Sequence, residues 1–154
     1  MIQVGNAAPA FTLFSSDKKQ VSLGDFAGKN VVLLFFPQAF TGTCTKELCD
    51  MRDNLSKYES LNAAVLAVSV DSVFTLEKYK TEQNYNFPML SDFNKDVSAA
   101  YGSLYEDFVF GMKGVSKRSA FVIDGEGLVR YAEVLDNAGE IPDFAAVRNA
   151  LSAL

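Results

Sequence analysis

The chain contains no histidine and no tryptophan, and only two cysteines among its 154 residues. Without histidine, Ser-His-Asp and Cys-His nucleophilic systems are excluded, as are zinc, copper and haem sites that need an imidazole ligand. Two cysteines are too few for a four-thiolate zinc site, so the sequence predicts no metal and no cofactor. A nucleophilic cysteine here must be activated by backbone dipoles and by an arginine or lysine.

Long apolar segments are also absent. The apolar run at residues 31–36 is far short of the roughly 20 residues that cross a bilayer. Residues 1–11 lack the basic start and apolar stretch of a secretory signal. We therefore expect a cytoplasmic protein without a membrane partner. In such a compartment the two cysteines are thiols, and any disulfide between them is transient.

Basic residues are fewer than acidic ones, 14 against 19, which gives a net charge of −5. The resulting field repels phosphate backbones, so nucleic acid is not an expected partner. A chain of this length buries roughly 70% of the surface that its unfolded form exposes. Because the composition is ordinary for a globular protein and shows no repeat or linker, we expect a single domain over residues 1–154.

The first half of the chain predicts two strand-helix units in series. Residues 30–36 are apolar, β-branched and aromatic, and they end at Pro37, as in a buried central strand. Residues 44–61 have a helical pattern of apolar positions. Residues 64–70 form a second buried strand, and Ser72 is the expected N-cap of a helix that runs to about residue 84.

The second half is less regular at first and then predicts a hairpin and a helix. Residues 120–123 and 128–134 flank an Asp-Gly-Glu-Gly turn that joins two strands. An amphipathic helix follows at residues 144–154. Together with an extended patch at residues 11–14, this order predicts an α/β, thioredoxin-like fold. It carries an N-terminal extension and an insertion before the C-terminal β-hairpin.

Cys44 stands where a nucleophile is expected, because it follows a strand and a loop and opens a helix. Free N–H groups and the helix dipole at such a position favour an anion. Thr41 is placed to direct its hydroxyl at the sulfur or at an incoming oxygen, and Pro37 to shield the sulfur from water. The alternative is that Cys44 is a small buried hydrophobic residue, and its placement alone does not decide between these interpretations.

The segment P-x-x-x-T-x-x-C, formed by Pro37, Thr41 and Cys44 after an apolar strand, strongly resembles the peroxiredoxin family. The longer segment FFPQAFTGTCTKELCDMRD is similar to two branches of it. One is the one-cysteine alkyl hydroperoxide reductase E type, and the other is the bacterioferritin-comigratory, or Q, type. LSDFNKDVSAAYG and KRSAFVID also resemble family segments, so the similarity covers nearly the whole chain.

The resemblance implies a role for each matching residue. Cys44 matches the peroxidatic cysteine, Thr41 the residue that hydrogen-bonds peroxide and thiolate, and Pro37 the shielding proline. Arg118 matches the arginine that holds the thiolate, although an isolated arginine is ordinarily a solvated surface charge. Glu47 either orients Arg118 or is a glutamate on the helix surface. The implied reaction converts hydrogen peroxide or an organic hydroperoxide to water or an alcohol and leaves a sulfenic acid, which a thioredoxin-like or other thiol then reduces.

Cys49 is expected in the same helix as Cys44, five residues further on. In an ideal helix this spacing separates the Cα atoms by about 8.6 Å and the side chains by about 140°. Because a disulfide requires less than about 7 Å, the two sulfurs can bond only after the helix unwinds locally. The Q type uses this spacing for its resolving cysteine. The E type lacks that cysteine, and residues 37–42 and 91–93 resemble the E type more closely. We favour Cys49 as the resolving cysteine, and a spectator Cys49 with an external thiol is the alternative.

The apolar insertion at residues 104–112 either lines the approach to Cys44, forms a dimer face, or packs on the chain's own core. The two branches differ in assembly, so both a monomer and a homodimer are compatible with the sequence.

Two rival functions are a thiol-disulfide oxidoreductase and a non-catalytic thioredoxin-like binding protein. The first normally has two residues between its cysteines, whereas four separate Cys44 from Cys49.

Overall fold

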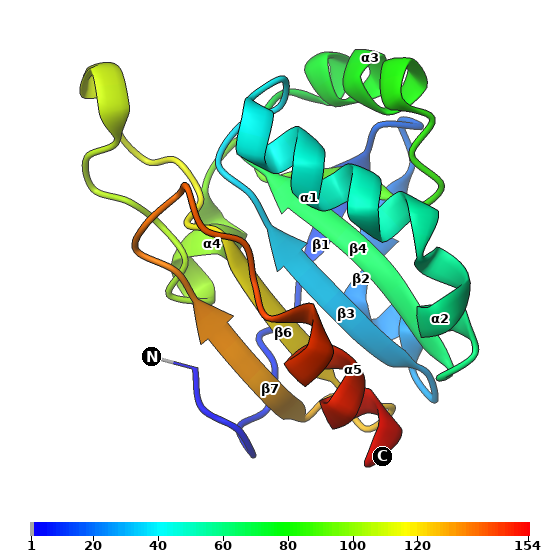
Figure 1. The fold of residues 1–154 in the computed structure, drawn as a ribbon. Helices are drawn as coiled ribbons and strands as arrows, with labels where there is room; N and C mark the ends of the chain where they lie inside the picture. Colours follow the sequence, from blue (N-terminus) through cyan, green and yellow to red (C-terminus); the bar gives the residue numbers. More distant parts are fainter. Residues whose placement is uncertain (1) are drawn as a thin grey trace.

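Residues 2–154 are described by a computed structural model, in which seven strands form one sheet in the order β2-β1-β5-β4-β3-β6-β7 (Figure 1). The strands are β1 (Thr12–Ser15), β2 (Gln20–Ser22), β3 (Asn30–Phe35), β4 (Ala63–Ser69), β5 (Met89–Ser91), β6 (Ser119–Ile123) and β7 (Val129–Val134). The α-helices are α1 (Gly42–Asp53), α2 (Leu55–Glu59), α3 (Val73–Gln83), α4 (Asp96–Ala100) and α5 (Phe144–Ser152), and the 3-10 helices are η1 (Leu23–Phe26) and η2 (Val109–Gly111).

The centre of the sheet combines parallel and antiparallel pairs. Strand β3 runs parallel to β4, which runs parallel to β5, whereas β6 is antiparallel to β3. Strands β3 and β4 are almost entirely buried, as expected of runs rich in valine, leucine and phenylalanine with helices on both faces. Because the carboxyl ends of β3, β4 and β5 lie at the same edge, the loops that follow them are neighbours.

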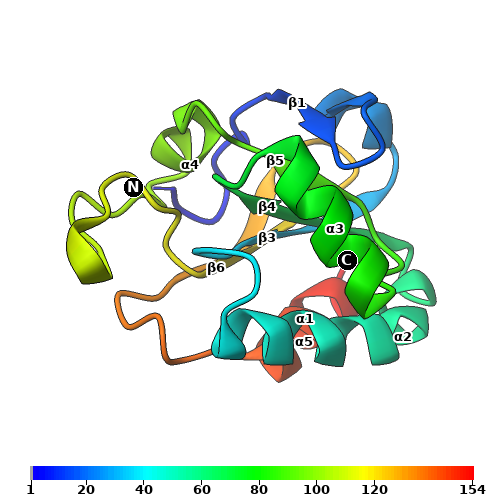
Figure 2. The same ribbon diagram turned by 90° about the horizontal axis from the view of Figure 1, so that it is seen from above.

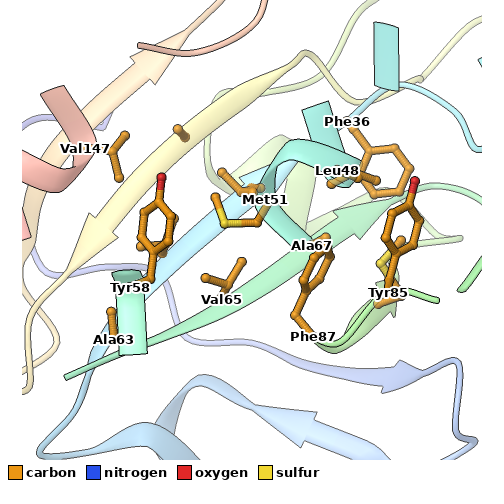
Figure 3. Close-up of a cluster of buried hydrophobic side chains, with 14 of the residues drawn as sticks. Phe36, Leu48, Met51, Tyr58, Ala63, Val65, Ala67, Tyr85, Phe87 and Val147 are labelled. Carbon is orange, nitrogen blue, oxygen red and sulfur yellow. The ribbon is translucent and has the colours of Figure 1, made fainter. Parts of the chain in front are cut away.

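Alternate residues of these strands supply two hydrophobic clusters, one on each face of the sheet. On one face, buried side chains of α1, α2, α3 and α5 pack on the sheet, and Figure 3 shows Leu48 and Met51 of α1 among them, with Val65 and Ala67 of β4. The other cluster lies beneath α4 and the N-terminal segment. Figure 2 shows this division, with α1, α2 and α5 below the sheet and α4 above it.

Most predicted elements are confirmed to within two residues at each end. This holds for the strands at 30–36 and 64–70, for the helix capped by Ser72, and for the hairpin and the last helix. The Ser72 hydroxyl accepts a hydrogen bond from the Thr75 N–H, and the helix ends at Asn84, whose φ of 55° stops it in the left-handed region.

The prediction of one helix over residues 44–61 is wrong in two details. It begins at Gly42 because Thr41, still extended, is the N-cap, so Cys44 is its third residue. It is also interrupted at Asn54, whose side-chain amide donates to the carbonyl of Asp50 at 2.7 Å. Asparagine competes for backbone hydrogen bonds in this way, and the apolar periodicity did not reveal it.

A hairpin of β1 and β2 extends the sheet at its far edge, where the sequence predicted only an extended patch at residues 11–14. At the other side of the molecule the segment around residue 110 extends away from the sheet (Figures 1 and 2, yellow-green). Within residues 2–154 no helix has both the length and the apolar character needed to span a membrane.

Leu66, fully buried in β4, tests this packing. We expect Leu66→Ala to lower the free energy of unfolding by about 3 kcal/mol, because it removes buried methyl groups and leaves a cavity. The measurement is urea unfolding followed by circular dichroism. The control is Leu154→Ala at a position 51% exposed, which should change stability by less than about 0.5 kcal/mol. Equal effects in the two variants would contradict the described core.

Candidate active site

Cys44 lies in the first turn of α1 with its side chain fully buried. The other buried residues of this helix are Glu47, Leu48 and Met51, at steps of three, four and seven from Cys44, so all four share one face that packs on the sheet. The first N–H groups of a helix have no carbonyl partner within it, and their partial positive charge points toward this end. Cys44 is therefore both shielded from solvent and placed where an anion is stabilised.

Arg118, directly before β6 and 74 residues after Cys44, reaches the same point. Ser119 pairs with Phe35, so Arg118 lies beside the exit of β3, where the loop to Cys44 begins. Side chains alternate along a strand, and Ala120 and Val122 belong to the cluster under α1. Arg118, two residues before Ala120, consequently extends toward α1.

The guanidinium of Arg118 is 1% exposed and donates hydrogen bonds to three groups. Nη2 lies 3.1 Å from Cys44 Sγ, and Nη1 lies 2.8 Å from Glu47 Oε1. Nε and Nη2 both donate to the carbonyl oxygen of Ala138, at 3.3 and 3.0 Å. Burial acts to lower the pKa of Arg118, but the Cys44 sulfur and the Glu47 carboxylate outweigh it and raise the pKa, so the group stays cationic.

Glu47 is fully buried, which rejects the alternative of a glutamate on the helix surface. Its Oε1 accepts from Arg118, while its Oε2 has no hydrogen-bond partner among the described residues. Burial raises the pKa of Glu47 from 4.5 to about 7, and the charge and hydrogen bond of Arg118 only partly offset this. The carboxyl therefore exchanges its proton near neutral pH.

The loop between β3 and α1 is fixed by contacts at its centre. Pro37 is buried at the strand exit, and Asp71, just after β4, accepts from the N–H of Ala39 at 2.8 Å and from Ser69 Oγ at 2.6 Å. The Thr41 hydroxyl donates to the carbonyl of Gln38 at 2.9 Å. The expected hydrogen bond from Thr41 to the sulfur is thus not made in this state, and its role toward peroxide stays a prediction.

A pocket of about 420 Å³ opens over this loop and leads to Arg118. Its walls come from the loop and first turn of α1, from the insertion, and from the segment after β7; they are Pro37, Gln38, Thr41, Gly42, Thr43, Phe108, Val109, Phe110, Met112, Arg118, Ala138 and Gly139. Residues 108–110 and 112 thus line a pocket that reaches Arg118, the hydrogen-bond partner of Cys44, and this supports the expectation that the insertion lines the approach to Cys44. Packing on the core is wrong for Phe110, which is 97% exposed.

Cys49 points away from Cys44, toward α3 and the segment after it. Its Sγ lies 3.6 Å from Gln83 Oε1 and 3.9 Å from the hydroxyl of Tyr85. Both cysteines are free thiols, as the helical spacing requires. An intramolecular disulfide therefore needs residues 44–49 to leave the helix.

The sequence did not reveal the contributions of Ala138 and Asp71. The Ala138 contact uses a backbone carbonyl, which no residue type signals. For Asp71 a signal existed, since a carboxylate directly after a central parallel strand lies at the edge where the β3 loop also lies.

Among residues 2–154, no group of three or more cysteine, aspartate or glutamate side chains is arranged to hold a metal. Arg118 and the start of α1 can together stabilise a negatively charged Cys44 sulfur, as a nucleophile, beside a pocket.

Comparison with known proteins gives a consistent match. The model of the AhpC/TSA family matches residues 4–132. Alkyl hydroperoxide reductase E of Mycobacterium tuberculosis is 41% identical over 157 residues, covering 100% of this chain and 99% of that protein. A putative peroxiredoxin bcp of Coxiella burnetii is 39% identical over 130 residues, covering 83% and 85%.

The fold is likewise that of solved peroxiredoxins, which confirms the predicted thioredoxin-like class. The crystal structure of peroxidoxin BcpB from Mycobacterium tuberculosis superposes with a TM-score of 0.88 at 26% identity, covering 100% of this chain and 99% of that one.

The raised pKa of Glu47 predicts how stability depends on pH. Stability from the protonated carboxyl is fully present below about pH 4.5 and is lost as the pH rises through about 7. Between pH 5 and 8 the free energy of unfolding should fall by about 2 to 3 kcal/mol more with Glu47 than with Glu47→Gln. Urea unfolding at several pH values measures the difference, with Cys44→Ser in both proteins so that the sulfur beside Arg118 is absent from the comparison. Parallel pH profiles would contradict the assigned burial.

Proposed function

The chain belongs to the AhpC/TSA family of peroxiredoxins, and from this premise we propose that it reduces hydrogen peroxide and organic hydroperoxides with Cys44 as nucleophile. The observation that carries the proposal is the distance of 3.1 Å between Arg118 Nη2 and Cys44 Sγ at the start of α1. A buried cation at this distance favours the thiolate, which is the nucleophilic form of cysteine. No imidazole is needed for this activation.

In the first step the Cys44 thiolate attacks one oxygen of the hydroperoxide. The S–O bond forms as the O–O bond breaks, and the electron pair leaves on the second oxygen, which takes up a proton to become water or an alcohol. The sulfur is oxidised to a sulfenic acid and the peroxide is reduced. Arg118 and the free N–H groups of the first turn are placed to stabilise the charge that moves to the leaving oxygen.

The composition of the pocket supports organic hydroperoxides as substrates alongside hydrogen peroxide. Phe108, Val109, Phe110 and Met112 give it an apolar wall opposite the loop that carries Thr41. An alkyl group can bury its surface on this wall while the peroxide oxygens face Arg118.

For the second half of the cycle, we assign Cys49 as the resolving cysteine. Oxidation of the thiolate removes the negative charge on the sulfur beside Arg118, which weakens the hold of Arg118 on α1. The first turns of α1 can then unwind, and the Cys49 thiol attacks the sulfenic sulfur. The S–S bond forms, the S–O bond breaks, and the released oxygen leaves as water with the Cys49 proton.

We also propose a reductant, a cellular compartment and an assembly for this protein. We assign a thiol of the thioredoxin type as the donor that reduces the disulfide and the cytoplasm as the compartment, since two free cysteines suit a reducing environment. A homodimer is the proposed assembly, because exposed apolar side chains such as Phe93 and Phe110 are commonly covered by a partner.

The rival functions have less support. A thiol-disulfide oxidoreductase does not account for an arginine held against Cys44, and a binding protein with an idle Cys44 does not account for a buried cation between two acids. Membership of a peroxidase family favours neither rival.

Stopped-flow measurement of peroxide consumption tests the role of Cys44. The reduced protein should show a fast phase with hydrogen peroxide that Cys44→Ser abolishes, because serine has no comparable nucleophile. The matched control is Cys49→Ser, which should retain the fast phase. Equal rates in wild type and Cys44→Ser would reject the assignment.

Mass spectrometry after one equivalent of peroxide tests the role of Cys49. Wild type should form an intramolecular Cys44–Cys49 disulfide, seen as one cross-linked peptide. In Cys49→Ser the sulfenic acid has no internal partner, so a stable sulfenic or over-oxidised product should accumulate. If wild type also stops at the sulfenic acid, Cys49 is a spectator and an external thiol resolves the intermediate.

A further inference from the structure

Tyr79 of α3 contacts the chain on both sides of Cys44. Its side chain is fully buried, and its ring centroid lies 4.8 Å from that of Phe40, in the loop before α1. Its hydroxyl lies 2.9 Å from Oγ1 of Thr45, the residue directly after Cys44. The Tyr79 side chain thus contacts one residue before Cys44 and one residue after it.

The contacts continue toward Cys49 through Tyr85. The rings of Tyr79 and Tyr85 meet edge to face with centroids 5.1 Å apart, and the Tyr85 hydroxyl lies 3.9 Å from Cys49 Sγ. Tyr85 is held in turn by stacking on Phe87, and Figure 3 shows both residues in the hydrophobic cluster. The segment 40–49 contains the residues that must unwind for Cys49 to reach Cys44. Its start and middle are held against α3 by Tyr79, and its end contacts Tyr85, just after α3.

These contacts do not depend on the oxidation state of Cys44. The Arg118 interaction weakens once the thiolate becomes a sulfenic acid, but the Thr45–Tyr79 hydrogen bond contains no atom of Cys44. Burial raises the pKa of Tyr79 above its ordinary value of 10, so its hydroxyl stays protonated and available as a donor. Oxidation of Cys44 changes neither partner of this bond, so the bond is available to oppose unwinding in the oxidised protein.

We propose that Tyr79 is a positioning residue whose contacts with Phe40 and Thr45 keep α1 folded after oxidation and so limit the rate of disulfide formation. The proposal rests on the resolving role of Cys49 assigned above. While the contacts hold, the sulfenic acid stays in the pocket, where a second hydroperoxide can convert it to a sulfinic acid with release of water or an alcohol. Once they break, Cys49 displaces the sulfenic oxygen as water. Tyr79 thus sets the balance between resolution and over-oxidation.

Three substitutions test this proposal in the full-length protein. Tyr79→Phe removes only the hydroxyl, and Thr45→Val removes its partner with little change of shape. The control is Tyr101→Phe, which removes an equally buried hydroxyl that donates to Pro9 on the opposite face of the sheet. Two readouts are used. One is amide hydrogen exchange of residues 42–49 in the reduced protein, and the other is the rate of Cys44–Cys49 disulfide formation after one equivalent of hydrogen peroxide, followed by acid quench and mass spectrometry.

Tyr79→Phe and Thr45→Val should each raise both rates about fivefold, the effect expected of losing one neutral hydrogen bond. The double variant should be no faster than either single one, because both remove the same bond. The yield of sulfinic acid at excess peroxide should fall in parallel, and Tyr101→Phe should behave as wild type. A merely destabilising role would give additive effects and would also affect Tyr101→Phe.

Unchanged exchange and unchanged disulfide rates in Tyr79→Phe would overturn the role of Tyr79. Absence of any disulfide in wild type would instead overturn the role of Cys49. In that case the exchange rates of residues 42–49 alone decide whether Tyr79 holds the helix.

Discussion

A buried guanidinium must be matched by acceptors on every side, and Arg118 imposes that constraint on the whole site. Removing a cation from water is costly unless opposite charge and hydrogen bonds replace the solvent. Here Glu47, the Ala138 carbonyl and the Cys44 sulfur provide that replacement. Two of these lie on one face of α1, so α1, the start of β6 and the segment after β7 are held together at the site where we propose that peroxide is reduced.

The same interaction connects chemistry to folding. In the reduced protein, Arg118 has a carboxyl and a sulfur as acidic partners, and the first turn of α1 is held by both. On the proposed mechanism, oxidation to a sulfenic acid removes the charge on sulfur. The Arg118–Glu47 pair and neutral contacts, such as that between Thr45 and Tyr79, then remain to hold the helix. On our account the active site is thus most rigid when it must bind peroxide, and it loosens when the resolving cysteine must move.

Much of the fold was predictable because the buried strands β3 and β4 are apolar along their whole length and because Ser72 caps a regular helix. The order of elements then indicated the thioredoxin-like class. What could not be predicted depends on contacts distant in sequence. The burial of Glu47 depends on Arg118, which lies 71 residues after it, and a helical glutamate gives no sign of this partner beforehand. The Asn54 interruption involves a side-chain amide and the Ala138 contact a backbone carbonyl, and apolar periodicity encodes neither.

The role of Arg118 is best measured by the rate constant for the reaction of hydrogen peroxide with reduced protein in which Arg118 is replaced by methionine. The measurement uses stopped flow, with Cys49→Ser in both proteins so that only the first step is seen. The account predicts a loss of about a hundredfold to a thousandfold, as for removal of a preorganised donor from an active site. Arg130→Met, which removes a partly exposed arginine paired with Asp124, should have no effect. A rate in Arg118→Met within a few-fold of the parent would contradict the central claim.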